Sequence, residues 1–169
     1  MLFLKRLSDA FEEEQENVIQ HYVSEGKSEE DAKRLALDED EYDKTFFVPE
    51  RARWSNLKDL KHDIGAELNK ATEAIEEHNP SVQGVLISID FNIKNKLSDK
   101  KLQDLLSHFS KYRLRNEDFE SSDMLGSAYE YLIKQFADSA GKKGGEFYTP
   151  SQVVWLLVSL LKPSAGMKI

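Results

Sequence analysis

The spacing of the apolar residues is the strongest constraint on the fold of this chain, because they recur three, four or seven positions apart. The first such stretch, residues 3–23, carries Leu4, Leu7, Phe11, Val18 and Tyr22. This spacing places them on one face of a helix whose other face is acidic. Two later stretches repeat it, with Leu57, Leu60, Ile64, Leu68, Ala71 and Ile75 in one and Leu102, Leu105, Leu106 and Phe109 in the other. The sequence therefore predicts a mainly α fold.

Capping residues mark where these helices should begin and end. Ser28 is followed three residues later by Asp31, a capping-box pattern that predicts the start of a short helix. Ser55 is predicted to cap one long helix that continues until Pro80 stops it. Ser98 is predicted to start a further helix. Together these boundaries predict a helical bundle over residues 1–120.

Two segments between the predicted helices are apolar without helical spacing. The apolar residues of the segment 45–54, TFFVPERARW, are Phe46, Phe47, Val48 and Trp54. They lie around a proline, which favours a short extended segment that packs one helix onto another. The segment 85–92, VLISIDFN, is too short to predict more than a strand fragment or an irregular core segment.

Composition narrows the class of protein. With 169 residues and 40% hydrophobic content, the chain can bury a core as one domain or as one domain plus part of another. It has no cysteine, so disulfides, thiolate metal sites and a cysteine nucleophile are excluded. Its longest apolar run, 153–161, is too short to span a bilayer, and its first residues are charged too early for a signal peptide. We expect a cytoplasmic protein without a membrane contact.

Charge is distributed unevenly along the chain. Residues 1–80 carry 11 Lys/Arg and 21 Asp/Glu, a net charge of −10, whereas residues 81–169 carry 12 and 10, a net charge of +2. An N-terminal half this acidic should not lie along nucleic-acid phosphates by itself. If DNA is bound, another surface must supply most of the contact.

Neither the acidic run nor the histidines predict a metal site. The run Asp38, Glu39, Asp40, Glu41 and Asp43 contains no glycine, which a helix-loop-helix calcium loop requires at its sixth position, so we interpret it as a solvated turn. The four histidines, His21, His62, His78 and His108, have no partner at metal-ligand spacing. Each is predicted to be a surface or boundary residue.

The stretch 141–157, GKKGGEFYTPSQVVWLL, is the richest in chemical information. It follows a predicted helix with Leu125, Tyr129, Leu132, Ile133 and Phe136 on its inner face. Thr149 is predicted to be the N-cap of the next helix, with Pro150 at N1 and Gln152 completing a capping box. A free helix N-terminus would then face a glycine-rich loop.

This arrangement suits a ligand that combines an ammonium with a carboxylate. A helix N-terminus attracts anions, and glycines allow a ligand to approach the backbone closely. Glu146 could accept hydrogen bonds from an ammonium or a hydroxyl group, and Tyr148 could stack on a ring. The alternative is a connecting loop before a well-capped helix, because capping boxes are common.

Residues 125–163 resemble the joint between the helical and catalytic domains of the methylation (M) subunits of type I restriction-modification systems. The L-G-x-x-Y-E-Y-L-I-x-x-F core and the G-x-F-Y-T-P motif occur in the expected order. The resemblance extends back through FLKRLSDAFEEE, FFVPERARW, IGAELNKATEAIEEHNP and IDFN. It implies an S-adenosyl-L-methionine-dependent DNA adenine-N6 methyltransferase that works with a specificity (S) subunit, a second M subunit and DNA, and in some complexes with a restriction (R) subunit.

The resemblance also implies a fold and a cofactor site. It implies a helical domain over residues 1–120, followed over residues 121–169 by a linker helix and the start of a Rossmann-like methyltransferase domain. The implied S-adenosylmethionine site is lined by Glu146, Phe147, Tyr148, Thr149, Pro150 and Ser151. Ser151 departs from relatives that carry a basic residue after the proline.

The motifs that such an enzyme needs for catalysis are not in this sequence. No Gly-x-Gly occurs, and the only Asn-Pro, Asn79-Pro80, is followed by serine instead of by a second proline and an aromatic residue. We therefore expect the chain to be the N-terminal portion of the M subunit, without catalytic residues and inactive alone. The alternative is a non-catalytic helical protein-interaction module whose glycine-rich loop binds nothing.

Overall fold

The computed structural model describes residues 1–42, 45–119, 126, 130–133, 149 and 151–167. The chain divides into two compact units, Met1–Phe119 and Glu120–Ile169. We call them the N-terminal unit and the C-terminal unit and describe each by itself.

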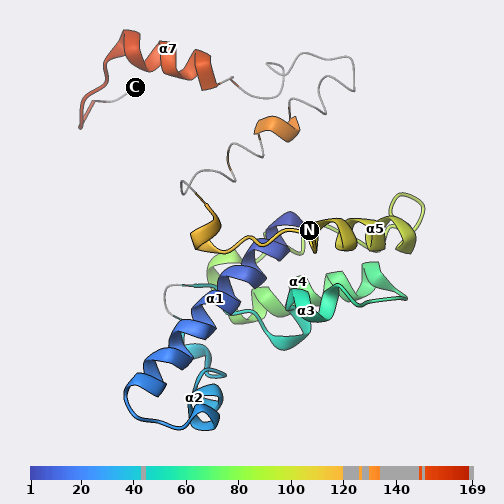
Figure 1. The fold of residues 1–169 in the computed structure, drawn as a ribbon. Helices are drawn as coiled ribbons and strands as arrows, with labels where there is room; N and C mark the ends of the chain where they lie inside the picture. The colour runs from blue at the N-terminus through green and yellow to red at the C-terminus, as the bar shows by residue number, and fades with distance from the viewer. Residues whose placement is uncertain (43–44, 120–125, 127–129, 134–148, 150, 168–169) are drawn as a thin grey trace. The chain divides into compact units, whose positions relative to one another are not determined.

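The N-terminal unit is helical, as predicted (Figure 1). Its α-helices are α1 (Leu2–Ser24), α2 (Glu29–Leu35), α3 (Trp54–Leu57), α4 (Ile64–His78) and α5 (Asp99–Phe109). Short 3-10 helices lie between them, η1 (Glu39–Glu41), η2 (Glu50–Ala52), η3 (Pro80–Val82) and η4 (Asn116–Asp118). No β-strand occurs among the residues described, so the segment 85–92 is irregular, one of the two forms predicted for it.

The predicted apolar stripe of α1 faces the core along the first half of the helix. Leu4, Leu7 and Phe11 are buried, whereas Val18 and Tyr22 are half-buried. Phe11 is fully buried, and its ring centroid lies 4.7 Å from that of Tyr42 and 5.3 Å from that of Phe47. The core therefore forms around the N-terminal half of α1.

The segment 45–54 connects α1 to α4, which confirms its predicted packing role, but it is not extended throughout as predicted, because Glu50–Ala52 form η2 and Trp54 begins α3. The Phe47 ring touches Phe11 of α1 on one side and lies 5.2 Å from the His78 ring of α4 on the other. Asn79, just after α4, donates from Nδ2 to the Phe47 carbonyl and accepts the Phe47 N–H, both at 2.9 Å. Aromatic packing and a paired hydrogen bond thus hold the segment in place.

The prediction of one long helix capped by Ser55 is wrong. Ser55 lies inside the four-residue helix α3, and α4 begins only at Ile64. Between them Asp63 adopts a left-handed backbone conformation, with φ of 49°, and its N–H donates to the Asp99 carboxylate at the start of α5. The helix breaks here because a tertiary contact fixes a backbone angle that a helix does not allow.

The apolar positions of the mispredicted helix are nevertheless buried. Leu57, Ile64, Leu68, Ala71 and Ile75 all belong to the core, and Leu60 packs against it half-buried. The apolar pattern therefore identified the buried side chains correctly, although it did not reveal the break in the backbone. As predicted, α4 ends directly before Asn79 and Pro80.

Ser98 and Ser28 cap their helices as predicted. The Ser98 hydroxyl accepts the Lys101 N–H at 3.4 Å, and the Ser28 hydroxyl accepts the Asp31 N–H at 3.1 Å. In α5, Leu102 and Leu106 are buried and Phe109 is half-buried, but Leu105 was wrongly predicted to be inside and is 39% exposed. Only a narrow stripe of α5 packs against the core, and Leu105 lies one position beside it.

The acidic run forms an exposed turn over residues 38–41, as predicted, and Asp38 caps it by accepting the Asp40 N–H at 3.2 Å. Asp43 lies outside the described residues. His21, His62, His78 and His108 are exposed, which confirms their predicted surface positions. Within the described part of the chain, no cluster of three or more His, Asp or Glu side chains could hold a metal ion.

In the C-terminal unit the structure describes a helical stretch at residues 130–133, helical Gly126, and helix α7 (Ser151–Leu161). Of the predicted inner face, Leu132 is 40% exposed and Ile133 is half-buried, while Leu125, Tyr129 and Phe136 lie outside the described residues. Helix α7 ends before Lys162, which takes a left-handed conformation with φ of 45°. None of the described helices is both long and apolar enough to cross a lipid bilayer.

Candidate functional site

The structure describes only part of the predicted cofactor site. Thr149 is exposed and non-helical, and α7 begins at Ser151, two residues later. Glu146, Phe147, Tyr148 and Pro150 lie outside the described residues, as does the glycine-rich loop. The grouping of these six residues into one site therefore stays a prediction.

The start of α7 has two features that favour anion binding at a helix terminus. The helix is 11 residues long, and no acidic residue lies in its first turn. Its first backbone N–H groups carry a partial positive charge, which carboxylates and phosphates stabilise. Thr149 is exposed two residues before this terminus, and its hydroxyl is a group that can donate to an anion or accept from an N–H.

The body of α7 is apolar on all sides, which distinguishes it from the other helices described. Every side chain from residue 152 to 161 is exposed, including Trp155 at 75% and Leu160 at 71%. A helix that is apolar all round is typical of a helix covered by other elements. The described residues of the C-terminal unit do not provide that cover.

The segment 113–119 leads the chain out of the N-terminal unit, and polar contacts fix it along α1. Arg6 donates to the Leu114 carbonyl at 2.9 Å and also contacts the Asn116 side chain. Asp9 accepts the Leu114 N–H at 2.7 Å, and Glu13 accepts the Asn116 N–H at 2.7 Å. We call this set of contacts the exit clasp.

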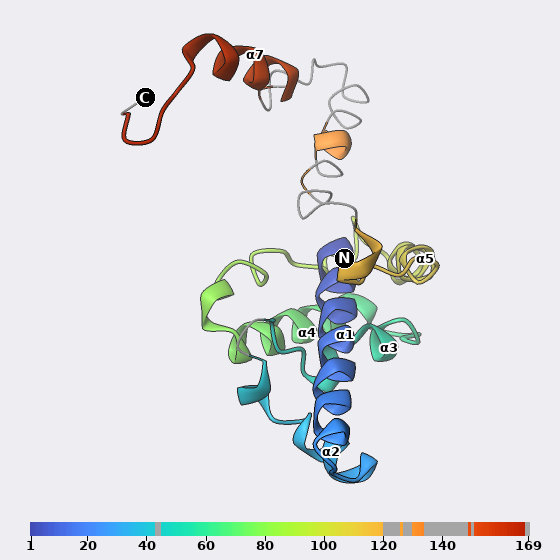
Figure 2. The same ribbon diagram turned by 60° about the vertical axis from the view of Figure 1, so that its left-hand side comes forward.

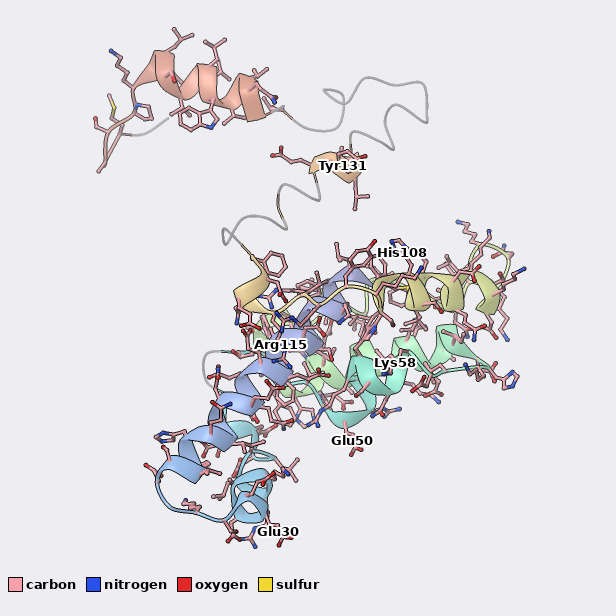
Figure 3. The ribbon with its side chains drawn as sticks, in the orientation of Figure 1. Glu30, Glu50, Lys58, His108, Arg115 and Tyr131 are labelled. Atoms are coloured by element: carbon pink, nitrogen blue, oxygen red, sulfur yellow. The ribbon has the colours of Figure 1, made fainter. Side chains whose placement is uncertain are left out.

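An ion pair extends the exit clasp one turn further along α1. Both terminal nitrogens of Arg115 donate to the Glu16 carboxylate, at 2.5 and 2.6 Å, and Figure 3 shows Arg115 beside this helix. The hydrogen bond from Arg115 lowers the pKa of Glu16. A bidentate arginine–carboxylate pair of this kind fixes the relative orientation of the two side chains in addition to attracting them.

The sequence analysis missed the exit clasp. Arg6, Asp9, Glu13 and Glu16 are spaced three, four and three positions apart, so they share one face of α1. That spacing could have indicated a second contact face, but we interpreted the side as acidic and solvated. The segment 113–119 has no apolar period to indicate that it returns to α1.

Comparison with known proteins establishes the family. The sequence profile of the HsdM N-terminal domain matches residues 1–109, well over half of the chain. The chain belongs to this family. A second profile, N-6 DNA Methylase, matches residues 120–169. The segment 113–119, which the exit clasp fixes to α1, lies between the two matched regions of the sequence.

The curated relatives carry corresponding names. The type I restriction enzyme HindI methylase subunit of Haemophilus influenzae is 32% identical over an alignment of 137 positions, which covers 70% of this chain and 31% of that protein. The MjaIX methylase subunit of Methanocaldococcus jannaschii is 28% identical over an alignment of 177 positions, which covers 98% of this chain and 31% of that protein. The MpnII methylase subunit of Mycoplasma pneumoniae is 31% identical over an alignment of 121 positions, which covers 67% of this chain and 22% of that protein.

These matches confirm the resemblance to type I methylation subunits. This HsdM-type chain spans about a third or less of the length of the relatives it matches, and it aligns with their N-terminal part.

Proposed function

We propose that this chain is the N-terminal portion of a methylation subunit that transfers a methyl group from S-adenosyl-L-methionine to N6 of adenine in DNA. The match of residues 120–169 to the N-6 DNA Methylase profile carries the proposal. The apolar, exposed surface of α7 supports it, because a catalytic domain that continues from this region would supply the missing cover.

We further propose that Glu146, Phe147, Tyr148, Thr149, Pro150 and Ser151 line the cofactor site. S-adenosylmethionine supplies the methyl group that is transferred. The start of α7 and the Thr149 hydroxyl would hold its methionine carboxylate, since a helix N-terminus and a hydroxyl both suit an anion. The exposure of Thr149 and the helix start at Ser151 support this part of the site.

The proposed partners are an S subunit, a second M subunit and DNA, with an R subunit in complexes that also cleave. Residues 1–80 carry a net charge of −10, so this part of the chain does not supply the main contact with the DNA phosphates. From the resemblance to type I methylation subunits, we propose that the S subunit reads the DNA sequence. Chemistry on a paired base requires its extrusion into a complete pocket, and the motif that holds the flipped adenine is not in this sequence.

The competing function is a helical interaction module without a cofactor. It is favoured by the core of the N-terminal unit, whose buried side chains come from α1, α3, α4, α5 and the segments between them and all belong to this unit. The two functions differ in whether the start of α7 binds a ligand.

The deciding experiment is a calorimetric titration of S-adenosylmethionine into the complete subunit and its Thr149 variants. Thr149→Ala should weaken cofactor binding by about ten- to a hundredfold, because a hydrogen bond to a charged group is lost. Thr149→Ser keeps the hydroxyl and should largely retain the affinity. Ser159→Ala, in the body of the same helix, is the matched control and should leave the affinity unchanged.

Two results would contradict the proposal. A Thr149→Ala variant with a lowered melting temperature but unchanged cofactor affinity would show that Thr149 is a structural cap only. Adenine methylation of DNA by the purified 169-residue chain alone would show that the catalytic groups are inside this chain. The second measurement requires only the chain, labelled cofactor and DNA.

A further inference from the structure

Two segments of the N-terminal unit lie along its helices, and they are held there in different ways. The first segment, residues 82–97, is a strap that runs antiparallel along α4 (Figure 2). The Glu76 carboxylate of α4 accepts the Ile87 N–H at 2.9 Å. Leu86 and Phe91 of the strap are buried in the core. The strap is therefore part of the hydrophobic core, and its removal from α4 would expose apolar surface.

The second segment, residues 113–119, is the one that the exit clasp fixes to α1. The structure describes every residue of this segment, and none of them is buried or belongs to the hydrophobic core. Leu114, Arg115 and Phe119 are half-buried. The guanidinium carbon of Arg6 lies 4.9 Å from the centre of the Phe119 ring. The segment is therefore held by hydrogen bonds, charge and one arginine–aromatic contact, and its release would leave the hydrophobic core complete.

The segment 113–119 also folds on itself, independently of α1. Asp118 accepts a hydrogen bond from Nη2 of Arg113 at 2.7 Å and another from the Arg115 N–H at 2.9 Å. The bond from Arg113, followed by that from the Arg115 backbone, lowers the pKa of Asp118, so this carboxylate is charged at neutral pH. These bonds close the turn that contains η4, so the segment can attach to α1 and leave it as one unit.

Release of this segment would lengthen the chain that leads out of the N-terminal unit. The seven residues 113–119 span at most about 24 Å when they are fully extended. Exposed ion pairs and single hydrogen bonds each contribute little stability, so a group of them can open while the core stays folded. The exit clasp is therefore built as a local contact that opens separately from the core.

We propose that the exit clasp is a detachable latch, and that Glu16 and Arg115 are positioning residues for methyl transfer. The second part rests on the proposed function. While it is closed, the latch fixes the place on α1 from which the chain continues into the residues that match the N-6 DNA Methylase profile. When it is open, it adds up to about 24 Å of free tether. A longer tether lowers the effective concentration of the catalytic domain at its target base.

Hydrogen–deuterium exchange of the 169-residue chain tests the latch itself. Glu16→Arg replaces the bidentate ion pair with two like charges, so the N–H groups of Leu114 and Asn116 should exchange about tenfold faster. Arg115→Glu should have the same effect, because it places a carboxylate opposite Glu16. The chain that carries both substitutions again has opposite charges at these positions and should exchange at the wild-type rate. Exchange in α4 and the melting temperature should stay unchanged in all three variants.

Glu30→Arg on α2 is the matched control, because it makes the same change of charge as Glu16→Arg. Glu30 is exposed, and Figure 3 shows it on α2, away from Arg115. The N–H groups of the segment 113–119 should exchange in this variant as they do in the wild type. Faster exchange would show that net charge, and not the ion pair, controls the segment.

Methyl transfer by the complete subunit, assembled in its complex, tests the positioning role. Glu16→Arg should lower kcat by about tenfold, because a longer tether makes the productive arrangement rarer. The affinity for S-adenosylmethionine should stay unchanged. The variant with both Glu16→Arg and Arg115→Glu should recover kcat, which distinguishes a role of the ion pair from a general defect caused by the loss of either side chain.

Two results would overturn the proposal. Unchanged exchange at Leu114 and Asn116 in both single variants would show that the ion pair does not close the latch. Faster exchange without a loss of kcat would show that the latch does not position the catalytic domain. If the wild-type complex transfers no methyl group, the proposed function and the positioning role both fail, whereas the exchange experiment still decides whether the latch opens.

Discussion

The two units of this chain treat apolar surface in opposite ways. In the N-terminal unit, helices with one apolar face bury it, and residues such as Phe11, Ile64 and Leu106 are fully inaccessible to solvent. In the C-terminal unit, α7 is apolar all round and exposed from residue 152 to residue 161. The contrast shows that a small unit can bury the apolar face of a helix that has only one, whereas a helix without a polar face requires other elements packed on every side.

The largest expected difference in the free energy of unfolding comes from truncating one large apolar residue in each unit. Phe11→Ala should lower the free energy of unfolding of the 169-residue chain by about 3–5 kcal/mol, because it leaves a cavity in the core. Trp155→Ala should change it by no more than about 0.5 kcal/mol, because Trp155 is 75% exposed. Chemical denaturation followed by circular dichroism measures both, and equal losses would show that α7 belongs to a shared core.

A smaller effect is expected where the strap touches α4. Gly65→Ala should destabilise the N-terminal unit by about 1–3 kcal/mol, although alanine favours a helix, because its Cβ would meet the Phe91 carbonyl and the strap must shift. Gly166, in the C-terminal unit, has no atom within 4 Å of an added Cβ. Gly166→Ala should therefore leave the main unfolding transition unchanged, and a stabilised Gly65→Ala variant would show that the strap is loose.

Removal of a helix cap should have a still smaller effect, and only in one unit. Ser98→Ala removes the hydroxyl that accepts the Lys101 N–H and should lower the stability of the N-terminal unit by about 1 kcal/mol. Thr149→Ala in the same 169-residue chain should leave that transition in place, since α7 contributes none of the buried core residues. Thermal melts of the two variants compare them directly, and a lowered melting temperature for both would contradict the difference.

The smallest expected effect is a dependence on pH within the N-terminal unit. Burial raises the pKa of Glu76, but hydrogen bonds from the backbone N–H groups of the strap, beginning with Ile87, outweigh burial and lower it below its ordinary value of 4.5. A lowered folded-state pKa gives stabilisation that is complete above pH 4.5 and is lost as the pH falls through the folded value.

Glu76→Gln should accordingly reduce the loss of stability on acidification below pH 4.5. The measurement is a series of urea denaturation curves between neutral and acidic pH. Glu73→Gln on the same helix, whose side chain accepts no strap N–H, is the matched control and should follow the wild-type curve. Identical acid dependence in the wild type and the Glu76 variant would show that this carboxylate does not hold the strap.

Local patterns predicted the elements of the N-terminal unit well where the relevant contacts are close in sequence. The caps at Ser28 and Ser98 were predicted correctly, because a capping hydroxyl bonds to an N–H only three residues away. The stop before Pro80 was correct for the same reason. The break between α3 and α4 was missed, since it depends on Asp63 meeting Asp99, 36 residues further along the chain.

The candidate site shows the same limit more strongly. The sequence predicted Thr149 as the N-cap and Pro150 as the first residue of the helix; α7 as described begins at Ser151, and Pro150 lies outside the described residues. Which of the six proposed residues meet around a ligand depends on the path of the glycine-rich loop, and glycines impose no single backbone conformation. Local rules therefore predict the helix but leave the geometry of the site open.

The sequence by itself determined the helical class, the identity of most core residues, the acidic charge of the N-terminal half and the family, because periodicity, composition and motifs are local properties of the chain. Only the tertiary structure decided the break at Asp63, the exit clasp on α1 and the strap along α4. Each of these joins a side chain to backbone groups far away in sequence, as Asp9 meets Leu114 and Glu76 meets Ile87. A hydrogen-bonding group does not indicate its distant partner in the sequence, because any backbone N–H can satisfy it until folding brings one into reach.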